Sequence, residues 1–338
     1  MIFSGHCSQM WRFCVLIVCC VISPLGIAEW HSASRDIMGT RITLTFWEDD
    51  TQRASDISQT VFAEFTRLDQ LLSPYIASSE LSRINREAAK GPINISVEVM
   101  RLLDKALYFG KLTDGAFDIS FASLGRFYNY REGQKPTAEQ WQIFRAAIDY
   151  RKIQLDRKQG TVFFAHPKLA IDLGGIAKGY AVDKAIEILD QQGITNASIS
   201  AGGDSRLLGD KQGKPWVVGI KHPRAAKDNA NDSNTALILL LSNTAISTSG
   251  DYERYFMDPD SGERIHHIIK PQSGRSASGV MSVSILGAQG FDTDPLSTSV
   301  FVMGVDRGLA LINRLPGFDA VIIDSRGKVH YSQGLVAP

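Results

Sequence analysis

The order in which helix-like and strand-like patterns follow one another limits the fold of this 338-residue chain more than any other feature. Helix-like patterns cover residues 55–72, 97–111, 137–149, 176–192, 296–303 and 306–315. Alternating or short apolar runs predict strands over residues 41–47, 152–156, 161–164, 197–200, 216–220, 236–241, 264–269, 280–286, 321–324 and 328–331. Because strands and helices do not alternate regularly, we expect an α+β fold with mixed, largely antiparallel sheets and packed helices.

Local signals mark where several of these elements begin and end. Ser96 is the expected N-cap of one helix, and Thr137 with Gln140 forms the capping box of another. Arg157-Lys-Gln-Gly160 lies between two short apolar runs and predicts a hairpin, and Gly193 is placed to end the helix before it.

Residues 1–28 have the order of parts found in a secretory signal peptide. Arg12 follows a polar start, residues 13–27 are almost wholly apolar, and small residues stand at the −3 and −1 positions of the expected cleavage site. The apolar run is short for a membrane span. We therefore expect cleavage after residue 28 and export to the periplasm. An N-terminal anchor that attaches the protein to the inner membrane is the alternative.

Residues 29–338 are expected to form a single domain, long enough to bury a core. The one linker-like stretch, residues 225–234, is rich in Ala, Asn and Asp. It lies between two expected strands, so we interpret it as a surface loop.

Composition excludes several classes of function. All four cysteines lie in the leader, so residues 29–338 can form no disulfide, thiolate nucleophile or cysteine-based zinc site. Arg12 is the leader's one charged residue, which leaves 35 basic and 36 acidic residues after it. This near-neutral balance argues against a dedicated nucleic-acid binder, which needs a basic face.

Two glycine-rich segments are candidate ligand sites. In Asp172-Leu-Gly-Gly-Ile-Ala-Lys-Gly179 a strand ends, two glycines turn and a helix begins, and the helix N-terminus with Lys178 suits a phosphate group. An ordinary strand-to-helix turn with a solvated lysine explains it equally well. Ser200-Ala-Gly-Gly-Asp-Ser205 allows a close backbone approach to a ligand, although a tight turn is the simpler interpretation.

A hydroxyl-rich run and a histidine pair invite a serine-hydrolase interpretation. However, Ala245-Ile-Ser-Thr-Ser-Gly-Asp251 contains no Gly-x-Ser-x-Gly motif. His266 and His267 would point to opposite faces of the strand expected over residues 264–269, so they would not chelate one metal together. We expect one histidine to face solvent and the other to be a core residue or a proton-transfer group.

The segment Phe291–Phe301 brings together a carboxylate and a hydroxyl. If Pro295 opens a helix, Asp294 and Thr298 share one face of it. Hard oxygen ligands of this kind suit Mg²⁺ better than zinc or copper. Capping of the helix N-terminus by Asp294 is the alternative.

Taken together, these segments resemble the ApbE-type FAD:protein FMN transferases, and the resemblance spans Met38 to Gly304. The matching pieces, in chain order, are Met38-Gly-Thr40, Leu72-Ser-Pro-Tyr-Ile76, Ser82-Arg-Ile-Asn85, Thr113-Asp-Gly-Ala-Phe-Asp118, Asp172-Leu-Gly-Gly-Ile-Ala-Lys-Gly179, Ala201-Gly-Gly203, Ile246-Ser-Thr-Ser-Gly250, His267-Ile-Ile-Lys-Pro271 and Asp294-Pro-Leu-Ser-Thr298. The resemblance implies a T-fold-like catalytic domain over residues 29–338.

The resemblance also implies functional residues. The FAD contacts would be Met38, Tyr75, Ala116, Phe117, Asp118, Asp172, Lys178 and Ile269. The Mg²⁺ ligands would be the Gly175 carbonyl, Asp294 and Thr298, with Ser297 as a weaker candidate. His267 would be the base, and Lys270 stands where the family has an acidic residue.

The implied activity is Mg²⁺-dependent transfer of the FMN moiety of FAD to a Ser or Thr hydroxyl of a target protein, with release of AMP. The implied target is a flavin-carrying subunit of a membrane redox complex or a periplasmic reductase. Two alternatives stay open. The same site could use water and act as an FAD pyrophosphatase, or the protein could bind flavin without catalysis.

Overall fold

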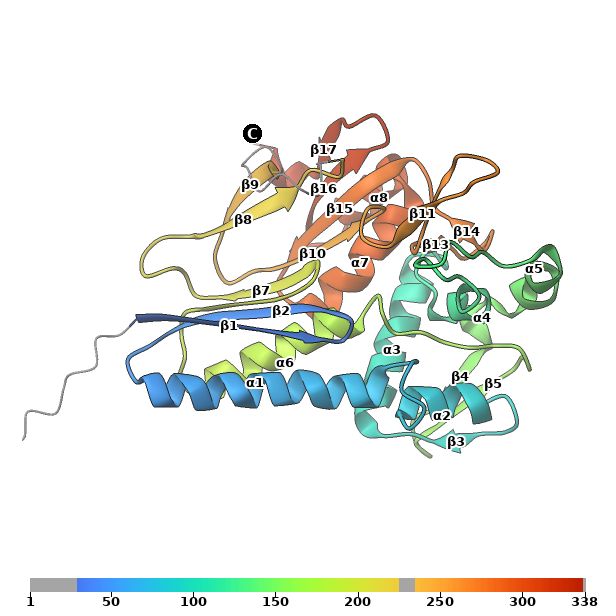
Figure 1. Ribbon diagram of the computed structural model, residues 1–338, viewed down its shortest axis with the longest axis horizontal. Coiled ribbons are helices and arrows are strands. Elements are labelled where there is room, and N and C mark those ends of the chain that lie inside the picture. Colours follow the sequence, from blue (N-terminus) through green and yellow to red (C-terminus); the bar gives the residue numbers. More distant parts are fainter. Residues whose placement is uncertain (1–28, 225–234, 337–338) are drawn as a thin grey trace, which may run out of the picture.

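The computed structural model describes residues 29–224 and 235–336 (Figure 1). The leader, residues 1–28, and the loop predicted over residues 225–234 lie outside the described residues. Within the described ranges, no helix is both long enough and apolar enough to cross a membrane.

Helices and strands are interleaved along the chain, with most helices in the first half. The α-helices of the described chain are α1 (Thr51–Leu72), α2 (Glu80–Glu87), α3 (Val97–Leu112), α4 (Ala122–Gly125), α5 (Ala138–Phe144), α6 (Ala177–Gln191), α7 (Gly290–Met303) and α8 (Val305–Ile312). The strands are β1 (Glu29–Ile37), β2 (Thr40–Glu48), β3 (Ile93–Asn94), β4 (Ile153–Asp156), β5 (Thr161–Phe164), β6 (Ala197–Ala201), β7 (Asp204–Leu208), β8 (Trp216–Lys221), β9 (Thr235–Leu241), β10 (Ala245–Gly250), β11 (Tyr255–Met257), β12 (Arg264–His266), β13 (Ile269–Lys270), β14 (Arg275–Ser276), β15 (Val280–Gly287), β16 (Asp319–Asp324) and β17 (Val329–Tyr331).

The largest sheet has eight strands in the order β1-β2-β6-β7-β10-β15-β16-β17. Every neighbouring pair in it is antiparallel. Smaller antiparallel sheets join β3-β5-β4, β8-β9, β11-β12 and β13-β14. The α+β fold with largely antiparallel sheets that the sequence predicts is therefore confirmed.

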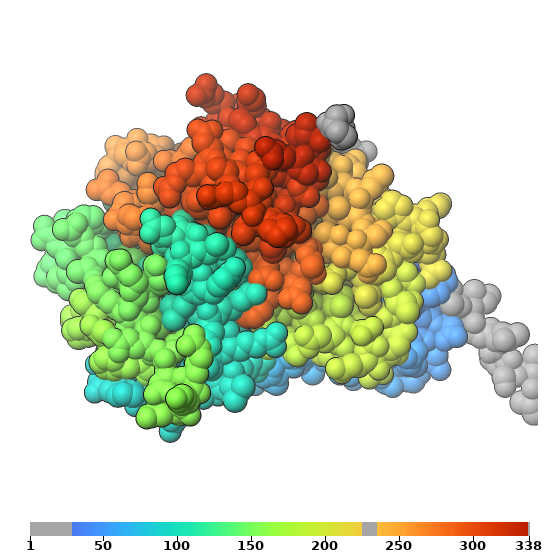
Figure 2. All heavy atoms as spheres, turned by 180° about the vertical axis from the view of Figure 1, so that it is seen from behind, coloured from blue at the N-terminus to red at the C-terminus, as the bar shows by residue number. Residues whose placement is uncertain are grey.

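Three helices cover the large sheet. Helix α1 packs on β1 and β2, α6 on β6 and β7, and α7 on β10 and β15 (Figure 1). On β2 the residues Ile42, Leu44 and Phe46 are fully buried, because every second side chain of a strand points to the same face. Seen from behind, α3 packs beside α7 (Figure 2). The core that results lies between the sheet and these helices.

Several local predictions are confirmed. The Ser96 hydroxyl accepts a hydrogen bond from the Val99 N–H (3.2 Å) at the start of α3. Thr137 and Gln140 form both hydrogen bonds of a capping box ahead of α5. Strands β4 and β5 form the predicted hairpin.

Other element boundaries differ from the prediction. The helix expected to end near residue 149 ends at Phe144, and a short 3₁₀ turn, Arg145–Ala147, follows it. The strand expected over residues 264–269 is broken into β12 and β13, which pair with different partners. Helix α7 begins at Gly290, so Pro295 lies inside it and does not open it. Strands β1, β7 and β10 and helix α2 are not among the predicted elements.

Two glycines let α6 and α7 cross in direct backbone contact. A Cβ placed on Gly179 would overlap the carbonyl of Gly290, and a Cβ on Gly290 would meet the carbonyl of Gly179. Asp183 of α6 accepts hydrogen bonds from the N–H groups of Gly290 (2.9 Å) and Phe291 (2.8 Å), which fixes where α7 begins. This crossing sets the position of every α7 side chain relative to the start of α6.

We predict that Gly179→Ala lowers the free energy of unfolding by about 3 kcal/mol, because the added methyl must push two helix backbones apart. Urea unfolding followed by circular dichroism measures the loss. Gly91→Ala is the matched control, because a Cβ at Gly91 meets no atom within 4 Å among the described residues. Equal stability of the two variants would contradict the proposed role of the crossing.

Candidate functional site

The segments singled out in the sequence converge at the N-terminal end of α6. The turn before α6, the start of β7, strand β10 and the face of α7 meet there, because α6 packs on β7 and α7 while α7 packs on β10 (Figure 1). Side chains far apart in sequence therefore surround one helix N-terminus.

The turn before α6 is shaped by Asp172. Its Oδ1 accepts a hydrogen bond from the Gly174 N–H (2.6 Å), and its own N–H donates to the Ile119 carbonyl (3.0 Å). Burial raises the pKa of Asp172. The N-cap of α6 is Ile176, whose apolar side chain cannot accept a hydrogen bond, so the first N–H groups of the helix depend on partners from elsewhere.

One such partner is Asp294 of α7. Its Oδ2 accepts a hydrogen bond from the Gly179 N–H (2.9 Å), and the residue is 3% exposed. Asp294 thus caps a helix, as the capping alternative predicts, but not its own helix. It bonds to the start of α6, and Asp183 caps α7. Burial, and then the neighbouring Asp204, raise the pKa of Asp294.

Lys178 lies between two buried carboxylates. Its Nζ is 2.9 Å from Asp204 Oδ2 and 3.7 Å from Asp294 Oδ2, and it donates to the Gly174 carbonyl (3.0 Å). Burial opposes the charge of Lys178, but attraction to Asp204 and Asp294 outweighs it and raises the pKa of the ammonium. When both carboxylates are ionised, the cluster of two carboxylates and one ammonium carries a net charge of −1.

The hydroxyls of α7 and β10 face each other. Ser249 Oγ lies 2.8 Å from Ser297 Oγ and 3.2 Å from Thr298 Oγ1. Ser297 also donates to the carbonyl of Asp294 (2.8 Å), so its hydroxyl is already engaged within its helix. Thr298 lies beside Gly175, where an added Cβ would come within 3.5 Å of Thr298 Oγ1.

This donor set fits a hard divalent cation. One carboxylate (Asp294), one hydroxyl (Thr298) and one main-chain carbonyl (Gly175) are the oxygen ligands that Mg²⁺ accepts, with water and substrate phosphates completing its shell. The described ranges contain no cluster of three or more His, Cys, Asp or Glu side chains that could hold a metal ion. A cation here would therefore rely on substrate and solvent for much of its coordination.

The expected flavin contacts differ in how exposed they are. Phe117 packs close to the cluster, since a Cβ on Gly175 would come within 3.1 Å of its ring. Met38 is at the tip of the β1–β2 hairpin with a positive φ of 55°, and Tyr75, in the loop between α1 and α2, is 88% exposed. The structure thus gathers Phe117 near Gly175 and Thr298 and leaves Tyr75 open to solvent.

Asp118 and Ala116 flank Phe117 and differ in surroundings. The Asp118 carboxylate accepts hydrogen bonds from the Ser120 N–H (2.8 Å) and the Tyr150 N–H (2.9 Å), and burial raises its pKa to about 6. Its carboxylate therefore stabilises two turns of the backbone, and its carbonyl accepts from the Phe121 N–H (3.1 Å).

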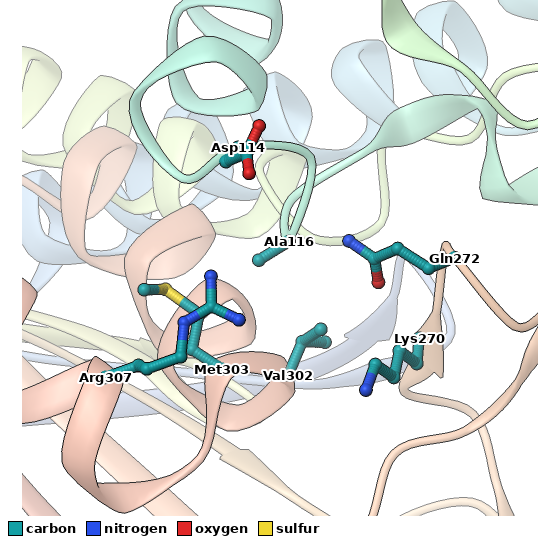
Figure 3. Close-up of a pocket in the computed structure, with 7 residues that line it drawn as sticks. All are labelled: Asp114, Ala116, Lys270, Gln272, Val302, Met303 and Arg307. Carbon is teal, nitrogen blue, oxygen red and sulfur yellow. The ribbon is translucent and has the colours of Figure 1, made fainter.

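Ala116 lines a cavity of about 310 Å³ (Figure 3). The loop carrying Asp114 and Ala116 forms one wall, and the end of α7 and the start of α8 form another. The full lining is Asp114, Ala116, Lys270, Gln272, Val302, Met303 and Arg307. Lys270 points into this cavity together with Arg307 (Figure 3). Ile269, which precedes Lys270, is 5% exposed.

The histidine pair differs from the prediction. His266 is 3% exposed, its Nε2 lies 2.8 Å from the Ala277 carbonyl, and its Nδ1 accepts from the Ile268 N–H (3.3 Å). The expectation that one histidine faces solvent is therefore wrong, because the strand breaks after His266 and the pair does not alternate across one sheet.

His267 is the member of the pair with unused hydrogen-bonding capacity. It is half-buried, and its Nδ1 is enclosed without a hydrogen-bond partner in the described chain. Burial first, and then the charge of Arg254, lower its pKa to about 3. In the ligand-free protein His267 is therefore uncharged at pH 7 and able to accept a proton.

Three further residues belong to this site without having been assigned a role from sequence. Asp204 pairs with Lys178, Ser249 contacts both hydroxyls of α7, and the Arg254 carbonyl accepts from the His267 N–H (3.1 Å). Asp204 and Ser249 both lie in segments rich in glycine and hydroxyl residues, and this composition is the sequence signal that could have identified them. Arg254 lies just beyond such a segment and had no signal of its own.

Comparison with known proteins agrees with this geometry. The model of the ApbE family matches residues 38–322. The FAD:protein FMN transferase of Treponema pallidum is 30% identical, covering 96% of this chain and 94% of its own. A solved ApbE protein from Thermotoga maritima is 31% identical with a TM-score of 0.80, covering 90% of this chain and 98% of its own.

The structural likeness extends to an ApbE described as a flavin transferase. The flavin transferase ApbE from Vibrio cholerae is 28% identical with a TM-score of 0.79, covering 91% of this chain and 98% of its own. The family match covers the cluster of Lys178, Asp204 and Asp294 together with the cavity and the histidine pair. The chain belongs to the ApbE family.

Proposed function

We propose that this protein transfers the FMN moiety of FAD to a Ser or Thr hydroxyl of a target protein, in a reaction that depends on Mg²⁺. The observation that carries the proposal is the buried Asp294 carboxylate beside the Lys178 ammonium at the start of α6, with the Thr298 hydroxyl next to Gly175 in the preceding turn. A helix N-terminus and a lysine attract phosphates, and a hard cation site supports chemistry on them. Curated relatives carry the name of this activity.

The bond changes are those of a phosphoryl transfer. The target hydroxyl oxygen attacks the phosphorus on the riboflavin side of the pyrophosphate, and the bond from that phosphorus to the bridging oxygen breaks. The bridging oxygen leaves with AMP, the target keeps FMN through a phosphoester, and the hydroxyl proton passes to a base. No oxidant or reductant is needed.

Asp294, Thr298 and the Gly175 carbonyl would hold the cation, with Ser297 as the weaker candidate because its hydroxyl already donates within α7. When bound, Mg²⁺ supplies neutralisation of the charge that develops on the leaving phosphate. Lys178 would bind phosphate oxygens from the helix side, and Asp172 keeps the turn before α6 in shape through Gly174.

His267 is the proposed proton acceptor. Its pKa of about 3 in the free protein results from burial and from the nearby cations Arg254 and Lys178. The pyrophosphate of FAD brings negative charge to this place, which offsets both cations and raises the pKa of the imidazole. The imidazole would thus be an uncharged proton acceptor in the free protein and a stronger base once substrate is bound.

The remaining proposed contacts concern the two ends of FAD. Met38 and Tyr75 offer apolar or aromatic surface, whereas Ile269 is a proposed contact with a buried side chain. Ala116, Phe117 and Asp118 lie along the loop that borders the cavity of Figure 3. The positive charges of Lys270 and Arg307 make that cavity suitable for an anionic part of a ligand.

The direct test incubates the protein with FAD, Mg²⁺ and candidate acceptor proteins and scans a denaturing gel for covalent flavin fluorescence. A fluorescent acceptor band and stoichiometric AMP support the proposal. FMN and AMP free in solution, without a labelled band, would instead identify an FAD pyrophosphatase. Tight flavin binding without turnover would identify a binding protein.

We predict that Asp294→Asn reduces covalent transfer at least 100-fold, because a carboxylate that neutralises a phosphoryl centre contributes several kcal/mol. The amide can still accept the Gly179 hydrogen bond, so the melting temperature should change by only a few degrees. Asp292→Asn is the control, since Asp292 lies on the same helix but pairs with Lys105 away from the cluster. An Asp294→Asn variant with normal transfer would remove the metal assignment.

We predict that His267→Gln slows transfer about 100-fold or more while FAD affinity stays within a few-fold, because the proton moves only when the hydroxyl attacks. The pKa of His267 is lowered to about 3, so the ring is neutral at both pH 6 and pH 8 in the free protein. Titration of His267 should therefore add no pH dependence to the rate constant for FAD binding between these two pH values. Stopped-flow flavin fluorescence and gel-based transfer rates provide the two measurements.

His266→Gln is the comparison for His267→Gln. It disturbs the bonds to the Ala277 carbonyl and the Ile268 N–H in the core, so its expected effect is a loss of about 1–3 kcal/mol of stability. If His267→Gln instead loses stability and FAD affinity together, His267 is a structural residue like His266. That result would refute the proton-transfer role.

We propose that the protein acts in the periplasm after removal of residues 1–28, and that its target is a flavin-carrying subunit of a membrane redox complex or a periplasmic reductase. The leader pattern supports export, and the charge balance gives no reason to expect a nucleic-acid partner. Intact-mass analysis of the protein from a periplasmic fraction should show a chain starting at Glu29. A mass that includes Met1 would support the anchored alternative.

A further inference from the structure

Lys178 is shared unequally between two buried carboxylates. Its Nζ is 2.9 Å from Asp204 but 3.7 Å from Asp294, so the direct ion pair is with Asp204. Asp204 is 2% exposed and stands at the start of β7, paired with Ala201 and Ser247 of the neighbouring strands. Its main-chain position is thus fixed by strand pairing on both sides.

The distance between Lys178 and Asp294 affects how well a divalent cation can bind Asp294. An ammonium in direct contact with Asp294 would occupy the same carboxylate that a divalent cation needs, and it would repel that cation at short range. An ammonium held by Asp204 and by the Gly174 carbonyl (3.0 Å) stays near the site, available to phosphate, without closing on Asp294.

We propose that Asp204 is a positioning residue that holds the Lys178 ammonium off Asp294 and thereby leaves that carboxylate free to bind a divalent cation. The inference rests on the proposed function, since it assigns a role within the proposed cation site. It concerns residues of this chain alone, and it is tested without FAD and without turnover.

Two other roles for Asp204 predict different behaviour. Asp204 could attract the cation directly through its own charge, in which case its effect would not depend on Lys178. It could also serve only the stability of the buried cluster, in which case its removal would lower the melting temperature and leave the affinity for the cation unchanged.

A double-mutant cycle separates these roles. The wild-type protein, Asp204→Asn, Lys178→Met and the double variant are titrated with Mn²⁺ alone, and free Mn²⁺ is measured by electron paramagnetic resonance. The rise in melting temperature on adding Mg²⁺ gives a second measurement on the same four proteins. Asn has nearly the shape of Asp, so the substitution removes the charge and little else.

We predict that Asp204→Asn weakens Mn²⁺ binding about tenfold when Lys178 is present and less than threefold in the Lys178→Met background. An equal loss in both backgrounds would show that Asp204 acts on the cation directly and would overturn the proposal. Unchanged binding in Asp204→Asn would overturn it as well. Wild-type protein that binds no Mn²⁺ would instead refute the proposed metal site itself.

Asp258→Asn is the matched control for removal of a buried carboxylate. Asp258 is 6% exposed and pairs with Lys135 (2.8 Å) in a separate ion pair. Its variant should lose stability and keep its affinity for Mn²⁺. Should Asp204→Asn fail to fold, Asp204→Ser in both backgrounds gives the same comparison, and equal losses in the two backgrounds would again overturn the inference.

Discussion

The backbone crossing of α6 and α7 is the contact on which the rest of the site depends. Gly179 and Gly290 allow the two helices to touch without side chains between them. Each helix then supplies a carboxylate to the N-terminus of the other: Asp183 of α6 bonds to the first N–H groups of α7, and Asp294 of α7 bonds to the Gly179 N–H near the start of α6. This reciprocal arrangement satisfies N–H groups that neither helix can satisfy alone, and it brings a carboxylate to the positive end of a helix dipole.

The same arrangement concentrates charge where burial makes charge costly. Asp204 and Asp294 are withdrawn from solvent, and the Lys178 side chain is only 25% exposed. When both carboxylates are ionised, the lysine balances only one of their two charges. Buried ions are weak contributors to stability, so a cluster with an excess negative charge is better explained by binding than by folding. Burial raises the pKa of Asp294, which is the expected response of a carboxyl group that lacks a full counter-charge. In the proposed function a divalent cation provides that charge.

The sequence was sufficient for the architecture and for elements whose signals are local. Strand alternation located β2, the Ser96 cap located α3, and the capping box located α5. The sequence was insufficient where an element depends on a partner residue that is distant in the chain. Strand β10 is rich in Ser and Thr, and it is a strand because its backbone pairs with β7 and β15 while its hydroxyls bond to Thr293, Ser284 and Ser297. Helix α7 begins five residues before Pro295 because Asp183, more than a hundred residues earlier, caps it.

Those hydroxyl contacts also decide against the hydrolase interpretation that the sequence invites. Alternation along β10 turns Ser247 and Ser249 toward α7 and Thr248 toward Ser284 of β15. A catalytic serine needs a histidine within hydrogen-bonding reach, whereas the described partners of Ser247 and Ser249 are other hydroxyls. Small hydroxyl side chains instead let β10 lie close to α7 while leaving oxygen atoms at the contact. Ser249 thus fixes the orientation of Thr298, and the run that suggested a nucleophile becomes the support for a proposed cation ligand.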